Sequence, residues 1–95
     1  MADDQSWDLQ RSDDEDGWLL TNTSARPAKA VAVEFRGRVD GRPWREGVTI
    51  NPSVLGAGEQ TYIRIFRSDT VTAVEVSWRG RFGRRKRWQA PSSAW

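Results

Sequence analysis

The sequence predicts an all-β fold, an immunoglobulin-like sandwich of about seven antiparallel strands. Apolar and polar residues alternate with a period of two in several segments, and no segment of useful length repeats apolar residues at helical spacing. Clusters of Gly, Pro, Asn and Asp separate these segments, as turns separate short strands. The chain has 95 residues, which suits one domain with one modest hydrophobic core.

The first two predicted strands, 7–10 and 18–21, are short and are separated by an acidic turn that closes at a glycine. The inward face of the second strand is ambiguous, because Trp18 and Leu20 lie opposite Leu19. The sequence therefore predicts two paired strands here without deciding which side of the second one is buried.

The middle of the chain carries the clearest alternation. Residues 31–35 alternate apolar with small or charged side chains, which is typical of a half-buried strand. Residues 40–43 form a strong turn signal, and a short strand at 48–50 is expected to stop at the Asn-Pro pair 51–52. The glycines of 56–58 indicate the next turn.

Three more strands are predicted over 62–66, 74–78 and 84–89, with a hairpin turn at 80–83 between the last two. Alternation assigns the inward positions of these strands and of the strand at 31–35. They are Val31, Val33, Phe35, Ile63, Ile65, Val74, Val76, Trp78 and Trp88.

Aromatic side chains on the other face of the strand at 62–66 allow two interpretations. Tyr62 and Phe66 lie opposite the isoleucines and, with Trp44, either form an exposed patch for a protein partner or cover the rim of the sandwich.

The chain divides into an acidic N-terminal arm at 1–6, predicted to be flexible, a sandwich domain at 7–90 and a C-terminal tail at 91–95. Residues 1–16 contain seven acidic residues against one arginine. No repeat and no second domain is evident. The acidic start and the lack of an apolar run of about 18 residues predict a cytoplasmic protein with no membrane segment.

The composition argues against catalysis. There is no histidine and no cysteine, which removes the usual general base, the serine triad, a thiolate nucleophile and a cysteine zinc site. The acidic run 13–16 before Gly17 suggests a calcium-binding loop. If Gly17 were the invariant glycine of that loop, however, Ser12 would occupy the first ligand position and Thr23 the position of the bidentate glutamate, so the loop pattern fails. We therefore expect no enzyme activity, no cofactor and no metal.

A basic hairpin at 79–88 is the strongest candidate for a binding surface. Its guanidinium groups can pair with phosphate or carboxylate groups, while an aromatic ring offers a stacking surface. Alternation places Arg85 and Arg87 on one face of the last strand. The residues of this candidate surface are Arg79, Arg81, Phe82, Arg84, Arg85, Lys86 and Arg87.

Three interpretations of this hairpin stay open. Charge on an edge strand protects a sheet from aggregation without any ligand. The acidic arm could fold against the hairpin as an internal counter-charge, with exposed ion pairs that each contribute about 0 to 1 kcal/mol. An external anionic partner is the third possibility, either nucleic acid or an acidic protein surface.

Three short segments resemble small bacterial immunoglobulin-like domains, which are similar to fibronectin type III modules. They are Asn22-Thr23-Ser24, the strand at 30–35, and Leu55-Gly56-Ala57-Gly58-Glu59 before the strand at Ile63. The two cysteines of an immunoglobulin domain are missing, Ala57 stands where the fibronectin pattern has proline, and Tyr62 follows Gly58 by four residues instead of three.

This resemblance, which spans roughly 7–90, implies a binding or structural module. We therefore expect a non-catalytic protein-interaction or structural domain with an unknown protein partner. The alternative is a nucleic-acid-binding domain that uses the hairpin at 79–88, and a partly open barrel of the OB type would favour that alternative.

Overall fold

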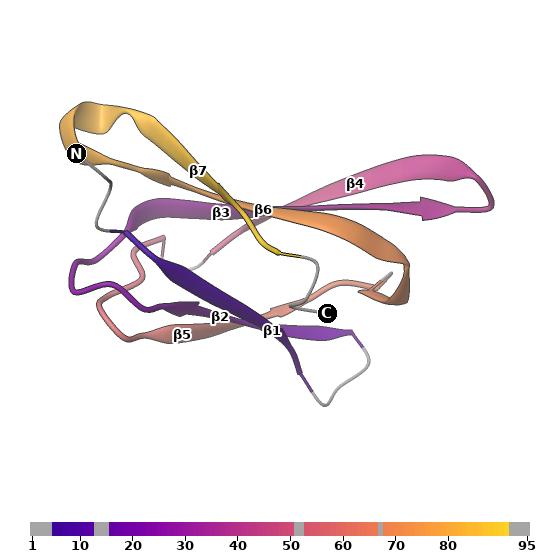
Figure 1. The fold of residues 1–95 in the computed structure, drawn as a ribbon, viewed down its shortest axis with the longest axis horizontal. Coiled ribbons are helices and arrows are strands. Elements are labelled where there is room, and N and C mark those ends of the chain that lie inside the picture. The colour runs from indigo at the N-terminus through magenta and orange to yellow at the C-terminus, as the bar shows by residue number, and fades with distance from the viewer. Residues whose placement is uncertain (1–4, 13–15, 51–52, 67, 92–95) are drawn as a thin grey trace.

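The computed structural model describes residues 5–12, 16–50, 53–66 and 68–91. It contains seven antiparallel strands in two sheets, which lie in two layers (Figure 1). The three-stranded sheet has the order β1 (Trp7–Arg11), β2 (Gly17–Asn22), β5 (Gln60–Arg64). The four-stranded sheet has the order β4 (Arg42–Thr49), β3 (Lys29–Val39), β6 (Val71–Arg79), β7 (Arg85–Gln89). The all-β prediction and the number of strands are confirmed.

The hydrophobic core lies between the two sheets and follows the alternation of the sequence. Every inward position predicted on β3, β5 and β6 is buried, and Trp88 of β7 is half-buried against the core. The ambiguity on β2 is resolved because Trp18 and Leu20 are completely buried, whereas Leu19 is half-buried. Burial of one face of β1, β2, β3, β5 and β6 holds the two layers together.

Tryptophans connect the sheets at two points. Trp18 of β2 packs on Phe35 of β3 with ring centroids 5.4 Å apart, and its Nε1 donates a 2.9 Å hydrogen bond to Ser68 Oγ. Trp7 of β1 packs on Trp78 of β6, also at 5.4 Å. Tilted aromatic pairs at this distance contribute energy beyond the area they bury.

A buried asparagine ties three chain segments together. Asn22, at the end of β2, donates hydrogen bonds from Nδ2 to the carbonyl oxygens of Arg26 and Leu55, at 2.8 and 2.9 Å. Its Oδ1 accepts hydrogen bonds from Ser24 Oγ at 2.6 Å and Gln5 Nε2 at 2.7 Å. The turn after β2 is therefore fixed by a satisfied polar network.

The β3–β4 hairpin corrects one prediction. The sequence predicts a short strand at 48–50, but β4 begins at Arg42, immediately after a two-residue turn. Asp40 and Gly41 have φ angles of +52° and +78°, which is the conformation of Asp-Gly in a tight hairpin turn. The prediction was wrong because β4 is an edge strand that is largely exposed on both faces, so its first half shows no alternation.

Trp44 of β4 packs against the core from the edge of the sheet. Its Nε1 donates a 3.0 Å hydrogen bond to Thr70 Oγ1, and a Cβ at Gly37 would lie 2.7 Å from two atoms of its ring. Tyr62 is exposed on β5 of the other sheet. These positions argue against one aromatic patch that includes Trp44, because Trp44 is half-buried against the core and Tyr62 lies on the other sheet.

Candidate binding surface

The basic hairpin forms as predicted and extends beyond the three-stranded sheet at one end of the molecule (Figure 1). β6 ends at Arg79, the turn contains the short 3-10 helix η2 (Arg81–Gly83), and β7 begins at Arg85. Gly80 N donates to the Arg84 carbonyl at 2.6 Å, and Gly83 N donates to the Gly80 carbonyl at 3.1 Å. The turn is thus closed by its own backbone.

Phe82, at the tip of this hairpin, has an unusual combination of backbone and side-chain properties. Its φ is +65°, in the left-handed region that disfavours bulky side chains, and the next residue, Gly83, has φ +76°. Its side chain is 91% exposed. The ring therefore contributes no burial that would offset the cost of its backbone conformation.

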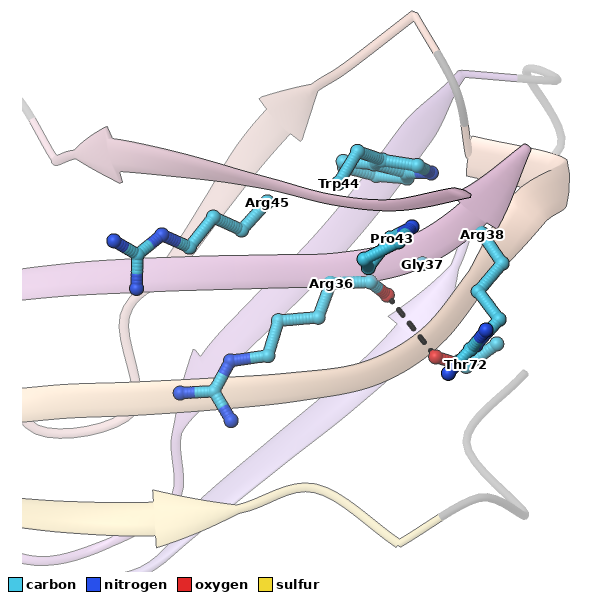
Figure 2. A pocket seen from close by; sticks show the side chains of 7 residues that line it. All are labelled: Arg36, Gly37, Arg38, Pro43, Trp44, Arg45 and Thr72. Atoms are coloured by element: carbon cyan, nitrogen blue, oxygen red, sulfur yellow. Dashed lines mark hydrogen bonds between the residues drawn. The ribbon is translucent and has the colours of Figure 1, made fainter. Parts of the chain in front are cut away.

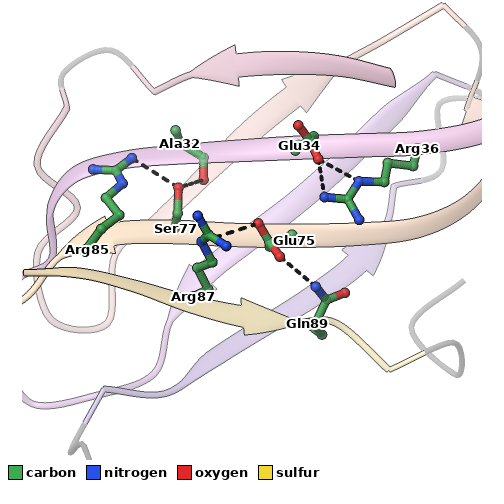
Figure 3. A network of polar contacts seen from close by, with 8 residues as sticks. All are labelled: Ala32, Glu34, Arg36, Glu75, Ser77, Arg85, Arg87 and Gln89. Atoms are coloured by element: carbon green, nitrogen blue, oxygen red, sulfur yellow. Dashed lines mark hydrogen bonds and ion pairs between the residues drawn. The ribbon is translucent and has the colours of Figure 1, made fainter. Parts of the chain in front are cut away.

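Two of the predicted arginines lie along the outer face of the four-stranded sheet (Figure 3). Arg85 donates from Nη1 to the Ala30 carbonyl at 2.8 Å and from Nη2 to Ser77 Oγ at 3.0 Å. Arg87 lies 3.9 Å from the carboxylate of Glu75. Both guanidinium groups point away from the core, as alternation predicted.

The remaining predicted residues lie around the same hairpin. Arg84 is exposed, and its side chain makes no hydrogen bond or ion pair with the described residues. The stem of Lys86 packs beside Gly80, where an added Cβ would lie 2.8 Å from its Cγ. Arg79 is exposed at the end of β6, and the backbone of Arg81 belongs to η2. The structure therefore gathers the predicted surface in one region.

The strand pairing creates a row of cations that the sequence does not reveal. Arg79 pairs directly with Arg85 on β7 and with Lys29 on β3, so three basic residues stand side by side across three strands. Like charges placed directly opposite each other destabilise a sheet. An anion bound to this row would relieve that repulsion.

A row of opposite charge crosses the middle of the same face. Glu34 of β3 is paired directly with Glu75 of β6. Arg36 is hydrogen-bonded and ion-paired to Glu34, and Gln89 Nε2 donates to Glu75 at 2.6 Å (Figure 3). The two carboxylates are thus compensated within the sheet.

A second group of arginines lies on the β3–β4 hairpin and was missed from the sequence. Arg36 and Arg45 are paired directly across the two strands, and Arg38 follows on β3. Together with Pro43 and Thr72 they line a hollow of about 430 Å³ (Figure 2). Sequence reasoning missed this group because β4 was not predicted to reach Arg45, although the Asp-Gly turn signal was present.

The structure bears on one of the three interpretations of the basic hairpin. β7 is an edge strand, so its charge is in the right place to protect the edge. Most of the acidic residues of the N-terminal run lie outside the described residues, among them 3, 4 and 13–15. Pairing between the acidic arm and the hairpin therefore stays a prediction, as does an external partner.

The exposure of these arginines leads to a first testable prediction. Replacing Arg84, Arg85 and Arg87 together with serine should leave the fold intact and lower the free energy of unfolding by less than about 2 kcal/mol, because exposed ion pairs and hydrogen bonds each contribute little. Urea denaturation followed by tryptophan fluorescence measures this. Loss of folding would show that these side chains are structural.

The described residues contain no group of three or more acidic residues close enough together to hold a metal ion. In the same parts of the chain, no helix has the length and apolar character that crossing a membrane requires. The predicted cytoplasmic location stays a prediction.

Comparison with known proteins finds a likeness of fold alone. No protein-family model matches the chain, and neither does any curated protein. Solved structures do match the chain, and they match it over a part of their own length.

Both of these structures come from one enzyme, the GH20 exo-β-N-acetylglucosaminidase of Vibrio harveyi. The complex of that enzyme with N-acetylglucosamine aligns with a TM-score of 0.58, 17% sequence identity and 92% of this chain covered. An inactive mutant aligns with a TM-score of 0.54 and 16% identity over the same share. In both cases this chain spans 17% of the enzyme chain. At these identities the likeness concerns the fold alone.

Proposed function

We propose that this chain is a non-catalytic protein-interaction module with an immunoglobulin-like architecture, and that the β6–β7 hairpin is its contact surface. The order of the strands supports the architecture. In an immunoglobulin domain, strands A, B and E share one sheet, while C, F and G share the other and C′ is added beside C. The orders β1-β2-β5 and β4-β3-β6-β7 match this arrangement without strand D.

The observation that carries the proposal is Phe82. An aromatic residue in the left-handed region costs about 1 to 2 kcal/mol relative to a residue that tolerates it. Glycine or asparagine would serve the turn better, and the exposed ring adds nothing to the core. Strained backbone conformations cluster at functional sites, and this one carries an exposed aromatic side chain. An exposed ring beside arginines is also the composition of an interface anchor.

The charge pattern of the neighbouring sheet face favours a protein over nucleic acid. The cationic row at Arg79 and the carboxylate row of Glu34 and Glu75 lie on the same sheet face, separated by the row that contains Ser77. A phosphate backbone carries uniform negative charge and would find no free cation in the second row, where Glu34 and Glu75 are already paired within the sheet. A protein surface can present acidic groups to the first row and neutral polar groups to the second.

A stability measurement separates the functional role of Phe82 from a structural one. Phe82→Asn should leave the free energy of unfolding unchanged or raise it by up to about 1 kcal/mol, because asparagine tolerates positive φ better than phenylalanine. Guanidinium denaturation measures the change. A decrease of 1 kcal/mol or more would show that the ring stabilises the fold, and the argument for an interaction role would then be lost.

Site-specific photo-cross-linking tests the proposed function directly. A benzophenone amino acid is placed at position 82 in cells that produce the chain, and a matched control carries it at position 66, where Phe66 is 87% exposed. We expect a discrete protein adduct from position 82 and none from position 66. No adduct from position 82, or equal adducts from both positions, would contradict the proposal.

The same experiment evaluates nucleic acid as the second candidate partner. The observation that favours it is the exposed Phe82 ring among arginines, since bases stack on aromatic side chains beside a basic backbone track. An adduct removed by nuclease and resistant to protease would assign the hairpin to nucleic acid. An adduct with the opposite sensitivity would support a protein partner.

A further inference from the structure

A hollow of about 240 Å³ opens beside the turn of the β6–β7 hairpin, where β6 ends, next to the surface described above. We propose that it is a binding subsite for an oxyanion, a phosphate or carboxylate group, carried by the partner. Its lining comes from the N-terminal segment, the turn before β3 and the end of β6. The lining residues are Gln5, Arg26, Pro27, Lys29, Trp78, Arg79 and Gly80.

Three cations line the hollow, and two of them, Lys29 and Arg79, lie on neighbouring strands. Lys29 and Arg79 are paired directly across β3 and β6, and both are exposed. Neither side chain makes a hydrogen bond or ion pair with any residue that the structure describes, and no carboxylate is among the lining residues. Their mutual repulsion is therefore uncompensated by the described residues, which favours binding of an anion between them.

The uncharged part of the lining is held in place by the protein. Gln5 donates from Nε2 to Asn22 Oδ1 at 2.7 Å and to Ser24 Oγ at 2.6 Å. Trp78 is 95% buried in the core, with only 5% of its surface exposed, and packs on Trp7. The ligand would thus meet walls that are already ordered, which lowers the entropy cost of binding.

The chemistry of the two cations defines the ligand. The planar guanidinium of Arg79 can donate two parallel hydrogen bonds to one oxyanion, and the ammonium of Lys29 adds a second positive charge. The hollow is smaller than the pockets of about 300 to 1,000 Å³ that enclose whole small molecules. It suits the anionic end of a side chain, so this inference rests on the proposed protein partner.

Nuclear magnetic resonance titration tests the subsite without the partner. Sodium phosphate and sodium acetate are added separately to the ¹⁵N-labelled chain at constant ionic strength, with sodium chloride as the reference salt. The Trp78 indole N–H and the Gly80 amide report on the hollow. We expect saturable shifts of both signals with phosphate, with acetate or with both, and no saturable shift with chloride.

Substitutions of the two cations test whether they bind the anion. Arg79→Ser and Lys29→Ser should each weaken binding about tenfold, as expected for loss of one charge-assisted contact. The matched control is Arg45→Ser, which removes an exposed arginine from the same sheet outside the hollow and should leave the affinity unchanged.

The comparison of phosphate with acetate shows which oxyanion is preferred. Absence of a saturable shift, or equal affinity in Arg79→Ser, would overturn the subsite. That outcome differs from failure of the proposed function, because cross-linking from position 82 is measured separately, in a chain that keeps Lys29 and Arg79.

Discussion

Replacing Trp18 with alanine should lower the free energy of unfolding by about 3 to 5 kcal/mol, the range for truncating a large aromatic side chain in a core. Trp18 is completely buried and packs on Phe35 from the other sheet. Its loss would also leave Ser68 Oγ without the donor that now reaches it at 2.9 Å. Chemical denaturation followed by circular dichroism measures the change.

Phe66→Ala provides the matched control for this substitution. Phe66 is also aromatic, but 87% of it is exposed, so the same truncation should change the free energy of unfolding by less than about 0.5 kcal/mol. Equal effects of the two substitutions would contradict the placement of Trp18 in the core.

Replacing Asn22 with alanine should have the second largest effect, a loss of about 2 to 4 kcal/mol. The amide of Asn22 is fully buried. It donates hydrogen bonds to the carbonyl oxygens of Arg26 and Leu55 and accepts hydrogen bonds from Ser24 and Gln5. Removing it leaves several of these groups without partners, and each unsatisfied buried group costs about 1 to 3 kcal/mol.

Two further variants isolate the role of the amide. Asn22→Asp keeps the acceptor oxygen but loses both donated hydrogen bonds, so it should also destabilise the fold. Thr23→Ala changes an exposed residue in the same turn and should change the free energy of unfolding by less than about 0.5 kcal/mol. Denaturation midpoints measured in one buffer compare the three variants. A stable Asn22→Ala protein would show that water replaces the network.

Local sequence patterns predicted the parts of the fold that have one buried and one exposed face. The strands around Val33 and Val76 were predicted with the correct inward residues, because burial of one face imposes a period of two. The first half of β4 was not predicted, because an edge strand with both faces exposed has no such period. Asn22 was predicted only as part of a turn, because local sequence cannot show that Leu55 closes over it.

Only the part of the candidate surface that is continuous in the sequence could be predicted. The hairpin residues are consecutive, so their charge is visible in the sequence. Lys29 and Arg79 are 50 positions apart in the sequence, and only the pairing of β3 with β6 brings them together. The positive φ of Phe82 depends on the geometry of η2, which cannot be predicted from the residue types in the turn.

The strand order also has a consequence for the speed of folding. The hairpins β1–β2, β3–β4 and β6–β7 join neighbours in the sequence, whereas β2 with β5 and β3 with β6 join distant segments. Trp18 and Ser68, which meet in the core, are 50 residues apart. Chains dominated by such pairings lose loop entropy before they gain contacts and fold in milliseconds to seconds. Refolding of this small domain is therefore expected to be slow for its length, with the local hairpins forming before the two sheets are complete.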